Sequence, residues 1–311
     1  MFFIVNINKV KIMFKKFFKF IVVSPFYGLN FLIDILSLLN PQFKKIALDH
    51  QLHHSDSEIK KVKHVSCENK EIQLQFYTPN SLNIFRAESF SDKEPETLAW
   101  IEEFGKGESV LFDIGAHVGL YSIYHNKVNN SKCYAFEPSF FNLKLLLKNL
   151  NLNNCQDMTN IVSNPLFSTV GFNEFKYGSD VEGGALSAFG VDFGHDGKDI
   201  NSQVGSNVLG FSLDWMLDNA IIEIPNLIKI DVDGIEHIIL QGAKKVLTHS
   251  ECKSILVEVN DDFSEQSKEV DELLTGYGYI LRGKLHGESF NKPGKFSASY
   301  NQIWVKDNNQ I

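Results

Sequence analysis

The clearest chemical pattern in the sequence lies between Val110 and Glu137. An apolar run of strand length is followed by two glycines, Gly115 and Gly119, then by a helix-like segment and a second apolar run that ends at Glu137. The pattern predicts a strand–turn–helix–strand unit, and such units bind nucleosides in parallel sheets. Glu137, which stands 24 residues after Asp113, is expected to accept hydrogen bonds from both ribose hydroxyls. Glycine-rich strand–helix turns also occur without any ligand, so this alternative stays open.

The spacing of the glycines argues against a dinucleotide as the ligand. The chain has Gly115-x-x-x-Gly119 instead of Gly-x-Gly-x-x-Gly, with Asp113 two residues before the first glycine. A Tyr-x-x-x-Lys pair, typical of short-chain dehydrogenases, is absent from the sequence. The glycines still let backbone N–H groups approach a ligand closely, because they carry no Cβ atom.

The stretch from Asp113 to Gly119 resembles the methyl-donor loop of class I S-adenosylmethionine-dependent methyltransferases. More narrowly, it resembles the FkbM family of O-methyltransferases, and the likeness covers about residues 100 to 305. Three further stretches extend it: Ala135-Phe136-Glu137-Pro138, Leu213-Asp214-Trp215-Met216-Leu217 and Ile228-Lys229-Ile230-Asp231-Val232-Asp233-Gly234-Ile235-Glu236.

The resemblance implies a fold, a cofactor and a set of site residues. The expected fold is α/β, a doubly wound Rossmann-like domain with a seven-stranded sheet, and the expected methyl donor is S-adenosyl-L-methionine. On the acceptor side it implies Asp231 and Asp233, with His237 as a further catalytic candidate. The family usually has Asn where His117 stands and Glu where Asp233 stands. The implied cofactor-binding residues are Asp113, Gly115, Ala116, His117, Gly119, Glu137, Pro138 and Ser163.

A second pattern, Leu227 to Gly234, points to the same edge of the sheet without any family comparison. A strand covered on both faces is expected to be almost continuously apolar, yet Lys229, Asp231 and Asp233 alternate through this stretch. Buried charges are costly unless they pair or serve a site, and ligands bind at the carboxyl ends of such strands. The structural alternative is a Lys229–Asp231 pair followed by a capping box formed by Asp233 and Glu236.

The rest of the chain from residue 71 reads as alternating strands and helices. A glycine-rich stretch without periodicity, residues 178–210, is expected to form either a flap over the substrate or an irregular insertion, and its position just before the fourth strand favours the flap. Glu258 again places an acid inside an apolar strand, Ser254–Asn260. Strands are expected near 72–76, 110–114, 133–137, 158–164, 227–233, 279–281 and 300–305, with the last two antiparallel, and helices near 96–104, 139–150, 235–246 and before 274.

Composition excludes several classes of protein. The 311 residues include 30 Lys and Arg against 38 Asp and Glu, a net charge of −8, whereas nucleic-acid binding needs a basic surface. Nucleic acid is therefore not expected as the partner. Cys67, Cys133, Cys155 and Cys252 show no Cys-x-x-Cys spacing, so no metal site or disulfide framework is indicated, and a cytoplasmic protein with reduced thiols is expected.

The first seventy residues differ from the rest. Residues 1–50 carry seven Lys against Asp34 and Asp49, a local charge of +5. A basic amphipathic helix is expected there, with Phe14 and Ile21 on its apolar face, and such helices can bind anionic membrane surfaces. Packing on the catalytic domain or a partner is the open alternative. Residues 41–70 are interpreted as a linker or helical lead-in, giving an extension, 1–70, and a methyltransferase domain, 71–311.

Three functions compete. The leading one is transfer of the methyl group to a hydroxyl of a small molecule or glycan. The second is N-methylation on the same fold, since Asn164-Pro165-Leu166-Phe167 looks like an amine-holding loop but follows the third strand instead of the fourth. The third is a non-catalytic cofactor-binding or membrane-adaptor module. The charges of Lys229, Asp231 and Glu258 argue against it, because a purely structural core gains nothing from them.

Overall fold

The computed structural model describes residues 27–37, 40, 42–200, 202, 204–286 and 296–307, with backbone only for 50–55. Its contacts divide the chain into two units, Met1–Ser57 and Glu58–Ile311. The helix expected around Phe14 and Ile21 lies outside the described residues. The 1–70 and 71–311 division stays a prediction.

The first unit contains two described helices, residues 27–37 and α2 (Gln42–Ser57). An ion pair joins them, with Lys44 Nζ 2.8 Å from an Asp34 carboxylate oxygen. Large apolar side chains on both helices are exposed, among them Tyr27, Phe31 and Ile46. No described helix of the chain has the length and apolar character needed to cross a membrane.

The second unit is built on one seven-stranded sheet with the strand order β11-β12-β10-β9-β3-β4-β5. The five neighbouring strands β5, β4, β3, β9 and β10 are parallel to one another. At the edge beyond β10, β12 pairs antiparallel with β10 and with β11. This confirms the doubly wound α/β fold and the antiparallel edge pair. The strands are β3 (Val110–Ile114), β4 (Lys132–Phe136), β5 (Thr159–Val162), β9 (Leu227–Ile230), β10 (Ser254–Asn260), β11 (Tyr279–Leu285) and β12 (Ser299–Lys306).

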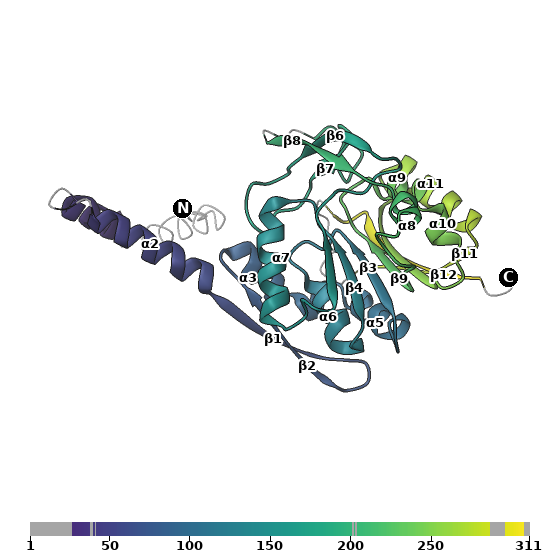
Figure 1. Ribbon diagram of the computed structural model, residues 1–311, viewed down its shortest axis with the longest axis horizontal. Helices are drawn as coiled ribbons and strands as arrows, with labels where there is room; N and C mark the ends of the chain where they lie inside the picture. Colours follow the sequence, from purple (N-terminus) through teal and green to yellow (C-terminus); the bar gives the residue numbers. More distant parts are fainter. Residues whose placement is uncertain are drawn as a thin grey trace, which may run out of the picture. The chain divides into compact units, whose positions relative to one another are not determined.

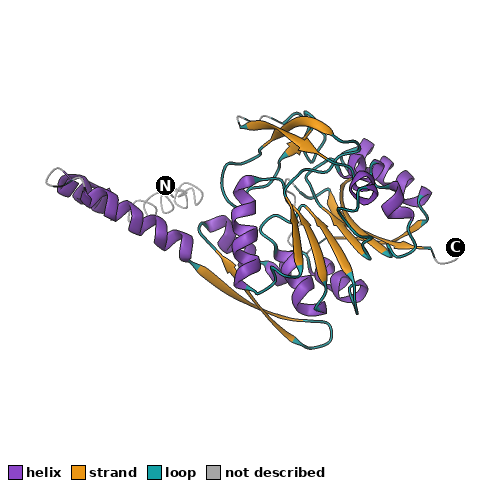
Figure 2. Ribbon diagram, viewed as in Figure 1, coloured by secondary structure: helices purple, strands orange, loops and turns teal. Residues whose placement is uncertain are grey.

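Helices cover both faces of this sheet (Figures 1 and 2). Two apolar cores result, one on each face, because alternate residues of a strand point to opposite sides. Leu111 belongs to one core and its neighbour Phe112 to the other. One core contains side chains from α3 (Ser81–Glu88), α4 (Phe90–Lys93), α5 (Pro95–Phe104), α6 (Leu120–Asn129) and α7 (Phe140–Leu152), and the other from α8 (Leu213–Asp218), α9 (Glu236–Gln241), α10 (Lys244–Thr248) and α11 (Ser264–Gly276).

An antiparallel hairpin, β1 (Ile59–Val65) and β2 (Glu71–Tyr77), precedes these helices. The expected strand near 72–76 is confirmed, and its apolar side chains are buried in the core on the side of the strand that contacts α6 and α7. The linker interpretation of residues 41–70 is wrong for β1. Its lysine-rich sequence hides the strand pattern, yet lysines are common on strands that have one unpaired edge.

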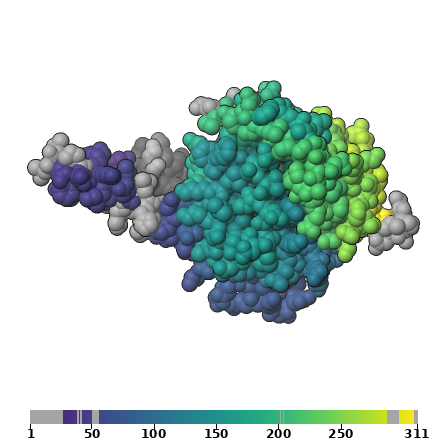
Figure 3. Space-filling model, in the orientation of Figure 1, coloured from purple at the N-terminus to yellow at the C-terminus, as the bar shows by residue number. Residues whose placement is uncertain are grey.

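A second small sheet with the order β7-β6-β8 follows β5. Its strands are β6 (Gly171–Lys176), β7 (Ala188–Phe189) and β8 (Gly205–Gly210). The expectation of one irregular flap over 178–210 is therefore wrong in part, because β7 and β8 anchor it at two points. In the space-filling view (Figure 3) the green surface of this segment adjoins the teal surface of the α6 and α7 region.

Candidate active site

The glycine loop after β3 joins the ends of three neighbouring strands. The N–H groups of Gly115 and Ala116 both donate to the Phe136 carbonyl of β4 at 3.0 Å. Gly115 has a φ of +84°, and a Cβ atom there would lie 1.9 Å from the carbonyl oxygen of Asp231, just after β9. Gly119 has a φ of +89° and begins α6. Only glycine fits this close approach, so the loop is held directly against Asp231.

Glu137 lies buried at the end of β4 and faces the same loop. Its Oε2 accepts the His117 N–H at 2.8 Å, and its Oε1 accepts the Ser139 N–H at 2.8 Å and an Asn142 amide at 3.4 Å. Burial raises the pKa of Glu137 to about 7, although the hydrogen bonds from these donors act in the opposite direction. A carboxylate oxygen has two acceptor positions, so Oε2 keeps one for a ligand hydroxyl.

The segment that precedes β7 is clamped over this loop. His117 Nε2 donates to the Gly184 carbonyl at 2.9 Å, and the Asn142 amide donates to the same oxygen at 3.1 Å. The Gly183 N–H donates back to the Asn142 side chain at 3.0 Å. Burial and the nearby Arg86 lower the pKa of His117 to about 3, so its ring is neutral and carries its proton on Nε2. Residues 183–184 thus form a cover over the predicted cofactor loop.

The same cover reaches the acceptor side. Arg86 donates twice to the Gly183 carbonyl, at 2.9 and 3.1 Å, and the Leu186 N–H donates to Asp233 Oδ2 at 2.6 Å. Leu186 and Asp233 both have a φ of +66°, a conformation that costs energy in residues other than glycine. The capping-box alternative is wrong for Asp233, because Ile235 is the N-cap of α9 and Asp233 binds the cover instead. Asp233 also leaves the strand, which ends at Ile230.

Glu236 holds the turn after β9 in shape. Its carboxylate accepts the Val232 N–H at 2.9 Å and the Gly234 N–H at 3.1 Å, and Gln266 donates to it from α11. Burial raises the pKa of Glu236 to about 7. These contacts point into the protein, so Glu236 supports the turn that carries Asp231 and Asp233.

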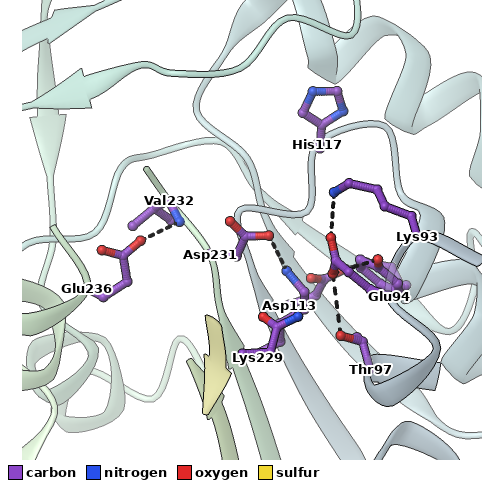
Figure 4. Close-up of polar contacts among 12 residues, drawn as sticks. Lys93, Glu94, Thr97, Asp113, His117, Lys229, Asp231, Val232 and Glu236 are labelled. Carbon is purple, nitrogen blue, oxygen red and sulfur yellow. Dashed lines mark hydrogen bonds and ion pairs between the residues drawn. The ribbon is translucent and has the colours of Figure 1, made fainter. Parts of the chain in front are cut away.

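Lys229 and Asp231 form an ion pair at the end of β9 (Figure 4). Nζ of Lys229 lies 2.8 Å from Asp231 Oδ2, and the Lys229 side chain is 1% exposed whereas that of Asp231 is 25% exposed. The amine lies over the Tyr121 ring, 5.0 Å from its centre. Burial opposes the charge, but Asp231, Glu94 and Asp113 outweigh it and raise the pKa of Lys229. Asp231 is thus fixed by a buried cation while its carboxylate stays accessible.

Glu94 is a site residue that the sequence did not reveal. It stands between α4 and α5, is buried, and forms an ion pair with Lys93 (Figure 4). Its carboxylate also accepts the Tyr121 hydroxyl at 2.8 Å and the Thr97 hydroxyl at 3.4 Å. Burial opposes ionisation, but Lys93 and Lys229 lower the pKa of Glu94 to about 2. Only the folded chain brings this anion beside Lys229.

Asp113 lies fully buried beneath the loop. Its Oδ2 accepts the Ser122 hydroxyl at 2.6 Å, and Oδ1 has no hydrogen-bond partner among the described residues. Burial raises the pKa of Asp113, although Lys229 acts in the opposite direction. Asp113 and Lys229 are register partners on β3 and β9. The Asp113 carboxyl therefore links β3 to α6 through Ser122, and it stands beside Lys229 on β9.

The remaining predicted residues are less closely joined. Pro138 follows Glu137 directly, whereas Ser163 is exposed just after β5 and makes no hydrogen bond to the glycine loop in the described part of the chain. The His237 ring lies against Phe193 and Phe263, with centroid distances of 6.5 and 5.8 Å. Burial lowers the pKa of His237, although Glu269 and Glu265 act in the opposite direction. The structure brings Asp231 and Asp233 to one edge with the loop, while the His237 side chain, on α9, is buried against these two aromatic rings.

Together these residues place hydrogen-bond acceptors beside a cluster of charged side chains at one edge of the sheet. Across residues 27–286 and 296–307, as far as they are described, no group of three or more His, Cys, Asp or Glu side chains is arranged to hold a metal ion. The chemistry that these side chains themselves support is proton transfer and electrostatic stabilisation at the ends of β9 and β10.

Residues 113–281 match the family model of the methyltransferase FkbM domain. A comparison with curated proteins finds no match to this sequence. Among solved structures, the fold is similar to FkbM from Methylobacillus flagellatus KT, with 14% identity and a TM-score of 0.43, over 64% of this chain. The present chain spans 43% of that protein's length.

Two further solved structures are similar at the same low identity. One is precorrin-6y C5,15-methyltransferase from Geobacter metallireducens GS-15, with 15% identity, a TM-score of 0.43, and 71% of this chain and 89% of that chain covered. The other is TrmK from M. capricolum in complex with S-adenosyl-homocysteine, with 13% identity, a TM-score of 0.38, and 68% and 67% covered.

Proposed function

The chain belongs to the FkbM family of S-adenosylmethionine-dependent methyltransferases, and we propose that it transfers the methyl group to a hydroxyl oxygen of a small molecule or sugar. The observation that carries this proposal is the contact between Gly115 and Asp231. The backbone carbonyl of Asp231 lies against Gly115, and the Asp231 side chain is 25% exposed and paired with Lys229, which supports a role for this carboxylate beside the proposed cofactor loop.

The residues of the glycine loop fit this cofactor. Glu137 keeps an acceptor position on Oε2 for a ribose hydroxyl, next to a loop whose backbone has no Cβ at Gly115 and Gly119. When bound, S-adenosylmethionine supplies an electrophilic methyl carbon, whose bond to sulfur breaks with its electron pair left on sulfur as the acceptor oxygen forms the new O–C bond.

Asp231 performs the proton chemistry in this proposal. Lys229 occupies its Oδ2, so Oδ1 is the oxygen that accepts the hydrogen bond of the acceptor hydroxyl and receives its proton as the O–H bond breaks. Holding the hydroxyl in line near the methyl carbon supplies several kcal/mol. General-base assistance contributes a further factor of about 10²–10⁴.

N-methylation remains the second candidate, and its motif is not supported by geometry. Asn164 follows β5 and donates to the Leu209 carbonyl of β8 at 2.9 Å, so its amide holds the small sheet. The non-catalytic alternative is opposed by the cost of burying Lys229 and Asp113 without using them.

The test is a screen with methyl-labelled S-adenosylmethionine against hydroxylated metabolites and sugars, with amines in parallel. Label is expected on oxygen of at least one hydroxylated acceptor, and Asp231→Asn is expected to reduce its turnover by about 10²–10⁴ with cofactor affinity largely kept. Asp157→Asn, an exposed aspartate, serves as the matched control. Label on nitrogen only, or unchanged turnover in a folded Asp231→Asn protein, would contradict the proposal.

A further inference from the structure

Glu258 stands beside Asp231 on the neighbouring strand. Val257 of β10 and Ile230 of β9 are register partners, so Glu258 and Asp231 are the next residues along the two parallel strands. Alternation also puts them on the same face, since Leu256 and Lys229 share that face and are partners. The two carboxyls therefore meet at the edge of the sheet where the cofactor loop lies.

The Glu258 side chain has no partner that explains its position. It is partly buried, and among the described residues it makes no hydrogen bond or ion pair. Asn301 on β12, the register partner of Glu258, donates its side-chain hydrogen bond to Glu96 instead. Asp231, by contrast, has Lys229.

The groups that face Glu258 are mostly acidic. Burial raises its pKa well above the ordinary value, and the nearby acids add to the effect. Lys93 interacts electrostatically with Glu258, but it already forms an ion pair with Glu94. The facing charged groups are Asp231 and Asp233 after β9, Glu236 on α9, and Lys93 and Glu94 at the α4–α5 junction.

We propose that Glu258 is the second carboxyl of the acceptor site, which holds a proton in the free protein, releases it when a cationic methyl donor binds, and takes up the acceptor's proton after transfer. This inference rests on the proposed function. Before the reaction the site would contain a cationic donor and a carboxylate, and afterwards a neutral thioether and a carboxylic acid. The charge of the buried site then stays constant, which avoids a large electrostatic cost in a medium of low dielectric.

In this scheme the two carboxyls have separate tasks. Asp231, fixed by Lys229, orients the hydroxyl and accepts its hydrogen bond. Asp231 passes the proton that it receives on to Glu258, because burial and the acids around Glu258 favour its protonated form. The proton lost by the acceptor oxygen is the proton gained by the Glu258 carboxylate, and it leaves to solvent when the next donor binds.

The test is calorimetry of the full chain with S-adenosylmethionine and, separately, with uncharged S-adenosylhomocysteine, each in two buffers with different heats of ionisation. The wild-type protein is expected to release up to about one proton per chain with the cationic ligand and clearly less with the neutral one. Glu258→Gln is expected to lose this difference. Glu251→Gln, an exposed glutamate just before β10, is the matched control and should keep it.

A second measurement, thermal unfolding against pH, separates a site role from a structural one. Because the folded pKa of Glu258 is raised, wild-type stability falls as pH rises from the unfolded value, about 4.3, through the folded one. Glu258→Gln should remove this loss and melt higher than wild type at neutral and alkaline pH. A variant that melts lower at every pH, or that keeps the proton difference, would overturn the inference. Absence of any cofactor binding would instead refute the proposed function, with the melting profile still deciding on Glu258.

Discussion

At the scale of single residues, Glu137 and Asp231 mark the two sides of the proposed site, one for the cofactor and one for the acceptor. Asp113, Gly115 and Glu137 stand in a local pattern, and the structure brings them to one strand edge. Glu94 and Asn142 left no such signal, because their roles depend on partners far along the chain. Asn142, for example, meets the Gly184 carbonyl 42 residues away.

Glu137 gives the sharpest prediction at this scale. Glu137→Ala should weaken S-adenosylmethionine binding by about 1–3 kcal/mol, because ribose hydroxyls lose a charged acceptor. The wild-type affinity should rise as the pH rises toward 7, since burial raises the pKa of Glu137 to about 7 and only the carboxylate accepts fully. Calorimetric titration across this pH range measures both effects.

The matched control is Glu108→Ala, which removes an exposed acid two residues before β3. It should keep the wild-type affinity and pH profile. Equal affinity in a folded Glu137→Ala protein would exclude Glu137 from the cofactor site.

At the scale of elements, most strands and helices of the domain were predicted from apolar runs and periodicity, which are local properties of sequence, and the doubly wound fold was implied by the family resemblance. The cover formed by residues 183–186 was not predicted in this way. Its glycines looked like an irregular flap, but four side chains from four other segments bind its backbone: Arg86 on α3, His117 in the glycine loop, Asn142 on α7 and Asp233 after β9. Backbone groups carry no sequence signal, so such contacts appear only in the folded chain.

Asn142 tests whether this cover is held as the structure shows. Asn142→Ala removes the hydrogen bonds to Gly184 and Gly183, which should lower the free energy of local opening by about 1–3 kcal/mol. Hydrogen exchange of the amides in 180–187 should then become roughly tenfold faster or more.

Asn151→Ala is the control on the same helix, because this exposed side chain bonds only to the Leu147 carbonyl one turn earlier. In this variant the backbone amides of residues 180–187 should exchange at the wild-type rate. Equal protection of the flap in Asn142→Ala would show that the Asn142 clamp does not hold the cover closed.

At the scale of the whole molecule, the chain combines an acidic catalytic unit with a basic start. Residues 1–50 carry +5 against −13 in the remainder. The exposed apolar side chains at 27–48, such as Phe31 and Ile46, add an apolar surface to that basic segment. We propose that the first unit binds anionic membrane surfaces, where lysines and apolar side chains act together.

Changing Lys15, Lys16 and Lys19 to Ala in the full chain should weaken binding to anionic vesicles, by about 1 kcal/mol per lysine near the surface. Added salt should weaken wild-type binding in the same direction. Co-sedimentation with anionic and with neutral vesicles measures this. A second triple variant, at the exposed lysines Lys61, Lys244 and Lys268 of the catalytic unit, should bind like wild type. If both triple variants sediment alike, the basic start is not the membrane-binding segment.

We propose that the loop from Asp113 to Gly119, together with Glu137, binds the methyl donor. Calorimetry of the wild-type protein with S-adenosylmethionine and, in a separate titration, with NAD tests it most directly. One molecule of S-adenosylmethionine per chain should bind, and Asp231→Asn should bind it too, while NAD should give no saturable heat. Saturable binding of NAD, with no binding of S-adenosylmethionine, would show that this loop does not bind the methyl donor.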